Sequence, residues 1–145
     1  SYQGQPFPYL PFPANVPPAH SERGLSMLPI SEAALDDHDA VERAAIPTER
    51  AHGPLLLLSG GDDRVWAAGR MCGMIVDRMS RHGRANDVTH LHYPHAGHML
   101  FPYVRPSDAI VPPYPMDHGG TTTDDLAAHT TAWPHVIEHL RGMPD

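Results

Sequence analysis

The sequence predicts an α/β chain in which parallel strands are flanked by helices. Two short segments have the composition of strands, and the segment between them has the periodicity of an amphipathic helix. A strand, a helix and a second strand in this order form a βαβ unit with a right-handed connection. With 145 residues, the chain has the length of one domain of ordinary size.

Residues 1–30 are predicted to be a proline-rich, extended lead-in to this unit, which we assign to residues 31–145. Proline fixes φ and lacks an N–H donor, so the lead-in is unsuited to a helix or a central strand. The aromatic residues Phe7, Tyr9 and Phe12 are spaced to press on a surface. A disordered linker is the alternative interpretation of this composition. Six of the 17 prolines lie in the first 18 residues: Pro6, Pro8, Pro11, Pro13, Pro17 and Pro18.

A helix is predicted over residues 31–45, ahead of the first strand. Ser31 is a candidate N-cap, and Glu32 lies in the first turn, where the helix dipole favours an anion. Pro47 ends the helix. The apolar run at residues 55–58 then predicts a strand buried on both faces, as in a parallel sheet.

The second half of the predicted unit is a helix over residues 67–82 and a strand over residues 88–93. Gly83 is a natural residue to end the helix, and Pro94 bounds the strand, in which apolar and polar residues alternate. The apolar side chains of the helix recur on one face. They are Met71, Cys72, Ile75, Val76 and Met79.

A last helix is predicted over residues 123–140, with one of the threonines at 121–123 as its cap and acidic residues in its first turn. Pro134 is expected to kink this helix or divide it in two. Its predicted apolar stripe consists of Leu126, Thr130, Trp133, Val136, Ile137 and Leu140. The preceding irregular segment, residues 94–120, has a length typical of functional loops.

Composition excludes several classes of protein. Ten Lys and Arg residues against 17 Asp and Glu give a net charge of −7, which disfavours nucleic acid as a partner. No apolar run approaches the length of about 20 residues that crosses a membrane. The single cysteine, Cys72, excludes an internal disulfide framework and a CxxC zinc site. With no recognisable signal peptide, we expect a cytoplasmic location.

Two loops at the carboxyl ends of the predicted strands carry the residues suited to catalysis: the acid loop, residues 59–66, and the histidine loop, residues 93–98. Ligands of open α/β sheets bind at this edge, and an aspartate beside a histidine fixes the tautomer of a general base. In α/β-hydrolases the acid precedes the histidine, and the acid loop commonly reads Gly-x-x-Asp. Counting from Gly60 selects Asp63 as the acid, with Asp62 as the alternative. His98 in the second loop is the candidate base.

Clustered histidines invite a different interpretation. His90, His92, His95 and His98 lie within nine residues, and His90 and His92 share one face of the predicted strand, as a metal-binding pair would. No cysteine or carboxylate stands at ligand spacing beside them. We therefore predict no metal site.

Three segments of the chain are distinctive: residues 46–50, residues 55–66 with the acid loop, and residues 93–98 with the histidine. In these segments the chain resembles the C-terminal part of the acyl-CoA thioesterase and bile acid-CoA:amino acid N-acyltransferase family. Further similarities are residues 6–9, residues 101–103, the glycine pair at 119–120 and Trp133. The resemblance implies the C-terminal portion of an α/β-hydrolase fold, acyl-CoA as substrate and no cofactor. It also implies that Asp63 is the catalytic acid and His98 the catalytic base.

The family's nucleophile is a Ser or Cys on a Gly-x-Ser/Cys-x-Gly turn, and this sequence contains no such turn. Ser59 precedes the acid, and Cys72 falls on the apolar face of its predicted helix, as a buried filler would. The resemblance therefore implies a fragment that lacks the nucleophile half and is inactive alone. We expect its partner to be the upstream half of the hydrolase or a second copy that associates through the bare sheet edge.

Alternatives remain for the reaction. An acyl-CoA thioesterase is the first hypothesis, and an amino acid N-acyltransferase uses the same acid and base. A dienelactone-hydrolase-like or other esterase and a non-enzymatic interaction module are the others. Residues 94–120 either line an acyl pocket or cover the sheet. The apolar side chains available for a pocket are Met99, Leu100, Phe101, Tyr103 and Val104.

Overall fold

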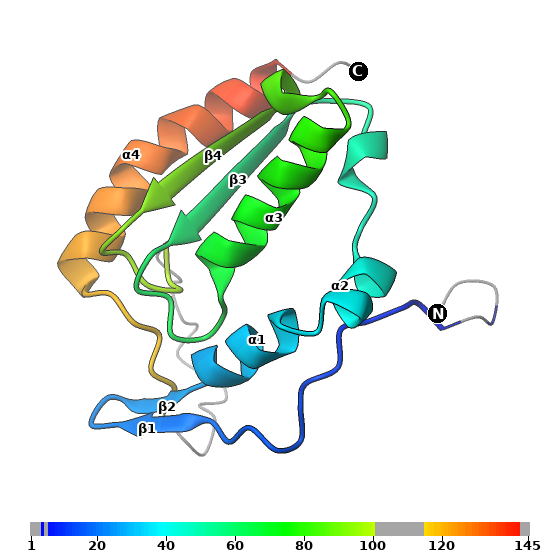
Figure 1. The fold of residues 1–145 in the computed structure, drawn as a ribbon. Coiled ribbons are helices and arrows are strands. Elements are labelled where there is room, and N and C mark those ends of the chain that lie inside the picture. The colour runs from blue at the N-terminus through cyan, green and yellow to red at the C-terminus, as the bar shows by residue number, and fades with distance from the viewer. Residues whose placement is uncertain (1–3, 5, 101–114, 143–145) are drawn as a thin grey trace.

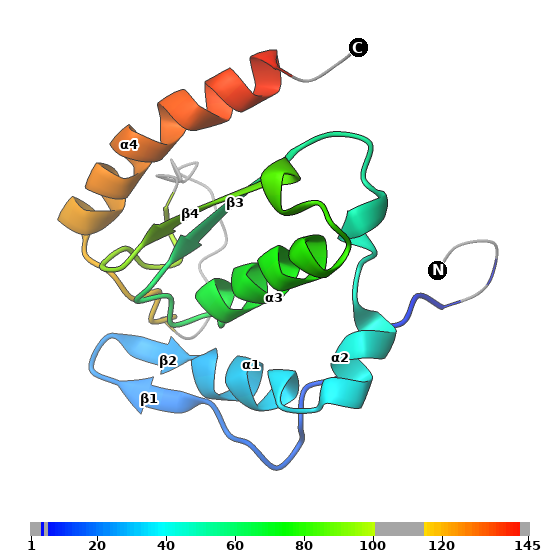
Figure 2. The same cartoon turned by 45° about the horizontal axis from the view of Figure 1, so that its top comes forward.

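The computed structural model describes residue 4, residues 6–100 and residues 115–142. Its centre is a pair of parallel strands, β3 (Leu55–Gly60) and β4 (Val88–Tyr93). The helix α3 (Ala68–Arg81) connects them, so the predicted βαβ unit is confirmed. The helices α3 and α4 (Thr122–Arg141) lie on opposite faces of the strand pair (Figures 1 and 2).

The strand β3 is less buried than predicted. Residues 55–58 are only half-buried, and full burial begins at Ser59 and Gly60. The sheet is the reason, because among the described residues β3 pairs with β4 alone. A two-stranded sheet leaves an edge open, and apolar side chains there stay partly accessible to solvent.

The helix predicted over residues 31–45 is two helices, α1 (Leu28–Leu35) and α2 (His38–Ala44). The first begins earlier than predicted because Pro29 fits the first turn, where a missing N–H costs nothing. Ser31 is therefore not an N-cap, and its hydroxyl accepts a hydrogen bond from the Ala67 N–H (3.0 Å). Asp37 caps the second helix by accepting from the Ala40 N–H (2.9 Å).

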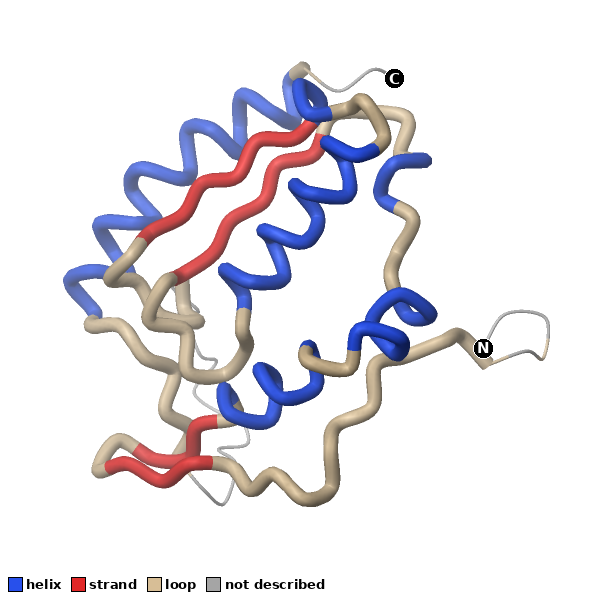
Figure 3. The backbone as a smooth tube through the Cα atoms, in the orientation of Figure 1, coloured by secondary structure: helices blue, strands red, loops and turns tan. Residues whose placement is uncertain are grey.

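A hairpin lies inside the segment predicted as an extended lead-in. It consists of β1 (Ala19–Ser21) and β2 (Gly24–Ser26), which are antiparallel (Figure 3). Leu25 also forms a bridge with Met116. The early prolines all precede it. Among the early aromatic residues, Phe12 contacts Trp66, with ring centroids 5.9 Å apart, whereas Phe7 and Tyr9 are exposed.

The helix α4 has the predicted cap, since the Thr121 hydroxyl accepts from the Asp124 N–H (3.1 Å). Its predicted apolar stripe was wrong. Ala128 and Ala132 are the buried residues, and Leu126, Trp133 and Leu140 are exposed. Small side chains let this helix approach the sheet closely.

Pro134 does not divide α4, which runs unbroken from Thr122 to Arg141. A proline in a helix leaves the carbonyl four residues earlier without its donor. Here that carbonyl belongs to Thr130, and both residues are exposed, so water can supply the missing bond.

The core beside the strand ends consists of Ala96, Leu100 and Ala128, with Leu58 and Tyr93 packed against them. This cluster holds the segment after β4 between the sheet and α4. The remaining short elements are the 3₁₀ turns at Thr48–Arg50 and Ala85–Asp87. Phe101, Tyr103 and Val104, predicted as pocket residues, lie outside the described residues.

Candidate acid–base site

Two loops meet at the carboxyl ends of β3 and β4. The N–H of Gly61 donates to the carbonyl of Tyr93 (2.8 Å), and that of Asp62 to the carbonyl of Ala96 (3.0 Å). A Cβ atom on Gly60 would stand 2.4 Å from the carbonyl oxygens of Ala96 and Gly97. Only glycine allows so close an approach, so Gly60 and Gly61 let the acid loop pack directly against the histidine loop.

Asp63 and His98 are the two predicted residues that this approach joins. The Asp63 Oδ2 atom lies 3.1 Å from His98 Nδ1. Its Oδ1 atom accepts from the N–H groups of Val65 (2.8 Å) and Trp66 (2.9 Å). Asp63 is buried, with 6% of its surface exposed, and one third of the His98 side chain is exposed. A buried carboxylate with three donors orients an imidazole that solvent still reaches.

Asp62, the alternative acid, points elsewhere. One of its oxygens is held by Arg64, with Nε and a terminal nitrogen at 2.8 and 2.7 Å. The other accepts from the Gly120 N–H (2.9 Å). Asp62 therefore ties the acid loop to the segment before α4 and does not contact the histidine.

The first helix fixes the far side of the acid loop. The Arg64 carbonyl accepts from the N–H groups of Met27 and Leu28 (both 3.0 Å) and from the Ser26 hydroxyl (2.8 Å). The Ser31–Ala67 bond closes the loop at its other end. The acid is thus held between β3 and α1.

The histidine loop is fixed by segments that the sequence analysis did not assign to the site. The His98 N–H donates to the His118 carbonyl (2.7 Å), and the two imidazoles stack with centroids 6.0 Å apart. The Gly97 N–H donates to Asp125 in the first turn of α4 (2.7 Å). Sequence reasoning missed His118 and Asp125 as contacts, although the glycine pair that follows His118 signals close backbone packing.

A second histidine cluster lies on one face of the β3–β4 strand pair. The Ser59 hydroxyl is fully buried and bonds to His90 Nε2 (2.8 Å) and His92 Nδ1 (2.9 Å). Burial, and then the neighbouring His92, lower the pKa of His90. The described residues contain no group of three histidine, cysteine or acidic side chains arranged to hold a metal ion.

Neither Ser59 nor Cys72 has the surroundings of an activated nucleophile. Ser59 has no solvent-exposed surface. Burial raises the pKa of the Cys72 thiol, and the opposing effect of Ser59 is smaller. A thiol with a raised pKa stays protonated at neutral pH and reacts slowly.

Other features lie away from the two loops. A cavity of about 460 Å³ lies between α2 and α3, with Leu35, Ile46 and Met74 among its mostly apolar lining residues.

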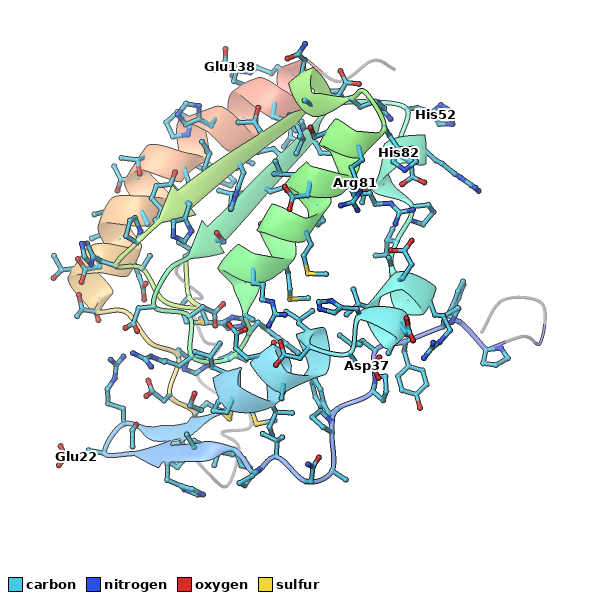
Figure 4. The ribbon with its side chains drawn as sticks, viewed as in Figure 1. Glu22, Asp37, His52, Arg81, His82 and Glu138 are labelled. Carbon is cyan, nitrogen blue, oxygen red and sulfur yellow. The ribbon has the colours of Figure 1, made fainter. Side chains whose placement is uncertain are left out.

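Figure 4 shows Arg81 and His82 at the C-terminal end of α3, the end away from the loops. In the described part of the chain, no helix is long and apolar enough to cross a membrane.

The fold and the two loops define a mixed α/β chain with a carboxylate–imidazole pair at the carboxyl edge of its parallel strands. The chain belongs to the BAAT / acyl-CoA thioester hydrolase C-terminal family, whose model matches residues 1–143.

Curated relatives agree with this membership. The chain is 35% identical over 100 residues to acyl-coenzyme A amino acid N-acyltransferase 1 of Mus musculus, covering 66% of this chain and 23% of that protein. It is 29% identical over 102 residues to the mouse peroxisomal succinyl-coenzyme A thioesterase, covering 63% and 23%. It is 25% identical over 152 residues to mouse bile acid-CoA:amino acid N-acyltransferase, covering 99% and 35%. The chain thus spans about a quarter to a third of the length of these relatives.

Proposed function

We propose that this chain supplies the catalytic acid and base of an enzyme that cleaves acyl-CoA thioesters on an α/β-hydrolase fold. The observation that carries the proposal is the 3.1 Å contact between Asp63 and His98 at the carboxyl ends of two parallel strands. Membership of a thioester hydrolase family supports it, as does the relative named as a thioesterase.

In the proposed reaction, a Ser or Cys outside this chain attacks the thioester carbonyl. His98 bonds to Asp63 through Nδ1, which leaves Nε2 to take the nucleophile's proton. The C–S bond breaks, and His98 returns the proton to the CoA thiolate as it leaves. His98 then deprotonates water, which attacks the carbonyl of the acyl-enzyme. The bond between the acyl group and the nucleophile breaks, the carboxylic acid is released, and His98 returns the proton to the nucleophile. Asp63 holds the imidazole in the required tautomer and stabilises its cationic form.

An amino acid N-acyltransferase is the second candidate, favoured by the relatives with that name. The first half of the reaction is the same. In the second half, the amine of an amino acid replaces water as the attacking group, and His98 accepts its proton as the amide bond forms. The bond between the acyl group and the nucleophile breaks, and His98 returns the proton to the nucleophile. Product analysis with and without an amino acid acceptor distinguishes the two reactions.

The test uses the full-length enzyme with Asp63→Asn and His98→Ala. We expect each to lower turnover of an acyl-CoA by about 10³-fold or more, because the base loses its orientation or is absent. The matched controls are Asp77→Asn and His82→Ala, two exposed residues of α3 and its end, which should retain full turnover. Turnover within tenfold of wild type in either site variant would contradict the proposal.

We further propose that a strand from the upstream half of the enzyme pairs with the open edge of β3. The half-buried leucines of β3 and the absence of a second partner strand among the described residues support this. Sedimentation and thermal melting of this chain alone provide the test. Self-association or a non-cooperative melt is expected, and a monomer that melts cooperatively would refute the idea.

A further inference from the structure

The hairpin β1–β2 is fastened to the segment that leads into α4. The N–H of Leu25 donates to the carbonyl of Pro115 (2.9 Å), and the N–H of Asp117 donates to the carbonyl of Leu25 (2.9 Å). A Cβ atom on Gly24 would stand 2.2 Å from the Pro115 carbonyl oxygen. Two segments far apart in sequence therefore lie in direct backbone contact.

Charged side chains strengthen this junction. Arg23 donates to the carbonyls of Gly119 and Gly120 (both 2.7 Å) and lies 3.4 Å from Asp117. Asp117 is buried and accepts from the Ser21 hydroxyl (2.9 Å) and the Gly119 N–H (3.0 Å). Burial alone would raise the pKa of Asp117. The Gly119 N–H, the Ser21 hydroxyl and the Arg23 guanidinium outweigh it and lower the pKa, so this carboxylate stays charged.

His118 is the residue between these anchors, and it touches His98 twice. Its carbonyl accepts from the His98 N–H (2.7 Å), which fixes the backbone of the base. Its imidazole stacks on the imidazole of His98, with the ring planes 22° apart. Asp63 bonds to one nitrogen at the edge of the ring, and a single such bond still allows the ring to swing about it. A second ring against the face removes this freedom.

We infer that His118 is a positioning residue for His98, and that Arg23 and Asp117 hold His118 in place. The inference deepens the proposed function and rests on it for its effect on turnover. The base is then confined by a carboxylate at its edge, by a backbone bond and by a stacked ring. The hairpin belongs to the support of the site although none of its residues contacts His98.

The test compares His118→Ala with His118→Phe in the full-length enzyme. The alanine variant loses the stacked ring and keeps the carbonyl, so we expect kcat to fall roughly tenfold while KM changes less than twofold. Phenylalanine restores a flat ring, and kcat should return to within about twofold of wild type. Equal losses in both variants, or wild-type kcat in the alanine variant, would overturn the inference.

A second readout does not depend on catalysis. Nitrogen NMR of His98 reports its tautomer, which the bond to Asp63 sets. We expect one Nδ1–H tautomer in wild type and in His118→Phe, and a mixture in His118→Ala. If His98→Ala leaves turnover intact, the proposed function fails. The tautomer of His98 still tests whether the stacked His118 ring positions it, because this readout does not depend on catalysis. Identical spectra in all three proteins would overturn it.

The anchor is tested by Arg23→Ala, with Glu22→Ala as its matched control. Glu22 occupies the turn of the same hairpin and points outward (Figure 4). Loss of Arg23 removes two bonds to the segment that carries His118, so we expect kcat to fall about threefold to tenfold with KM unchanged. The control should match wild type. Equal kcat in the two variants would remove the hairpin from the support of His98.

Discussion

The two histidine clusters of this chain use the same residue type in opposite ways. In the inner cluster, on one face of β3 and β4, the buried Ser59 hydroxyl bonds to the imidazoles of His90 and His92. In the outer pair, past the strand ends, the buried Asp63 carboxylate bonds to the imidazole of His98, which is one third exposed. A hydroxyl between two imidazoles satisfies neutral rings, and burial lowers the pKa of His90. A carboxylate instead favours the cationic ring that a general base must become. Exposure to solvent does not separate the clusters, since His92 is exposed and His90 is half-buried like His98. The hydrogen-bond partner of the ring, a hydroxyl or a carboxylate, is the difference between them.

Among substitutions outside the Asp63–His98 pair itself, the largest effect is expected where the acid loop meets the histidine loop. In Gly60→Ala, the new methyl group meets two carbonyl oxygens of the histidine loop at 2.4 Å. We expect a stability loss of about 1–3 kcal/mol and at least a hundredfold loss of turnover in the full-length enzyme. Denaturant unfolding and acyl-CoA hydrolysis measure the two effects.

The control for that substitution is Gly73→Ala in α3, where a Cβ atom meets nothing within 4 Å. Alanine there should raise stability by up to about 1 kcal/mol, because it is the better helix former. If Gly60→Ala behaved like this control, close approach of the two loops would not be what joins Asp63 to His98.

An intermediate effect is expected in the inner cluster. Ser59→Ala leaves His90 Nε2 without its partner in a half-buried site, and we expect a stability loss of about 1–3 kcal/mol. Turnover per folded molecule should be unchanged, since the Ser59 hydroxyl bonds to His90 and His92 and not to the Asp63–His98 pair. The exposed Ser80 provides the control, as Ser80→Ala should alter neither property. Loss of turnover in folded Ser59→Ala would mean that the inner cluster takes part in the reaction.

The smallest effect concerns pH. The pKa of His90 is lower in the folded chain than its ordinary value of about 6.5, so the unfolded chain binds more protons near that pH. The stability that neutral His90 provides is thus present above about pH 6.5 and is lost progressively below it. Stability measured from pH 7.5 to 5 should fall less in His90→Gln than in wild type. His82→Gln, at the exposed end of α3, should follow the wild-type curve, and identical curves for all three would contradict the expectation.

The elements that the sequence predicted well are those fixed by local pattern. An apolar run predicted β3, and alternation of apolar and polar residues predicted β4. Helical periodicity predicted α3, and a capping residue predicted the start of α4 at Thr121. The pairing of Asp63 with His98 followed from the rule that parallel strands end at one edge. The Gly-x-x-Asp spacing counted from Gly60 was also needed, because it selects Asp63 over Asp62.

What the sequence did not reveal depends on distant contacts. The hairpin strands are three residues each and show no alternation, and the hairpin is fastened to Met116 and Asp117, far along the chain. The buried face of α4 was misjudged because close packing favoured Ala128 and Ala132 over the larger Leu126. The stacking of His118 on His98 has no signature along the chain, since it depends on how the segment before α4 is held.

The attachment of the hairpin also sets an order of events during folding. Asp63 and His98 are 35 residues apart, whereas Ser21 and Asp117 are 96 apart. Loop-closure entropy makes the longer connection less favourable by about 1 kcal/mol, and long-range contacts form late. The strand–helix–strand unit can therefore bring acid and base together first. We expect the hairpin to dock against the returning chain only afterwards, so that the proposed support of His98 by His118 is completed late in folding.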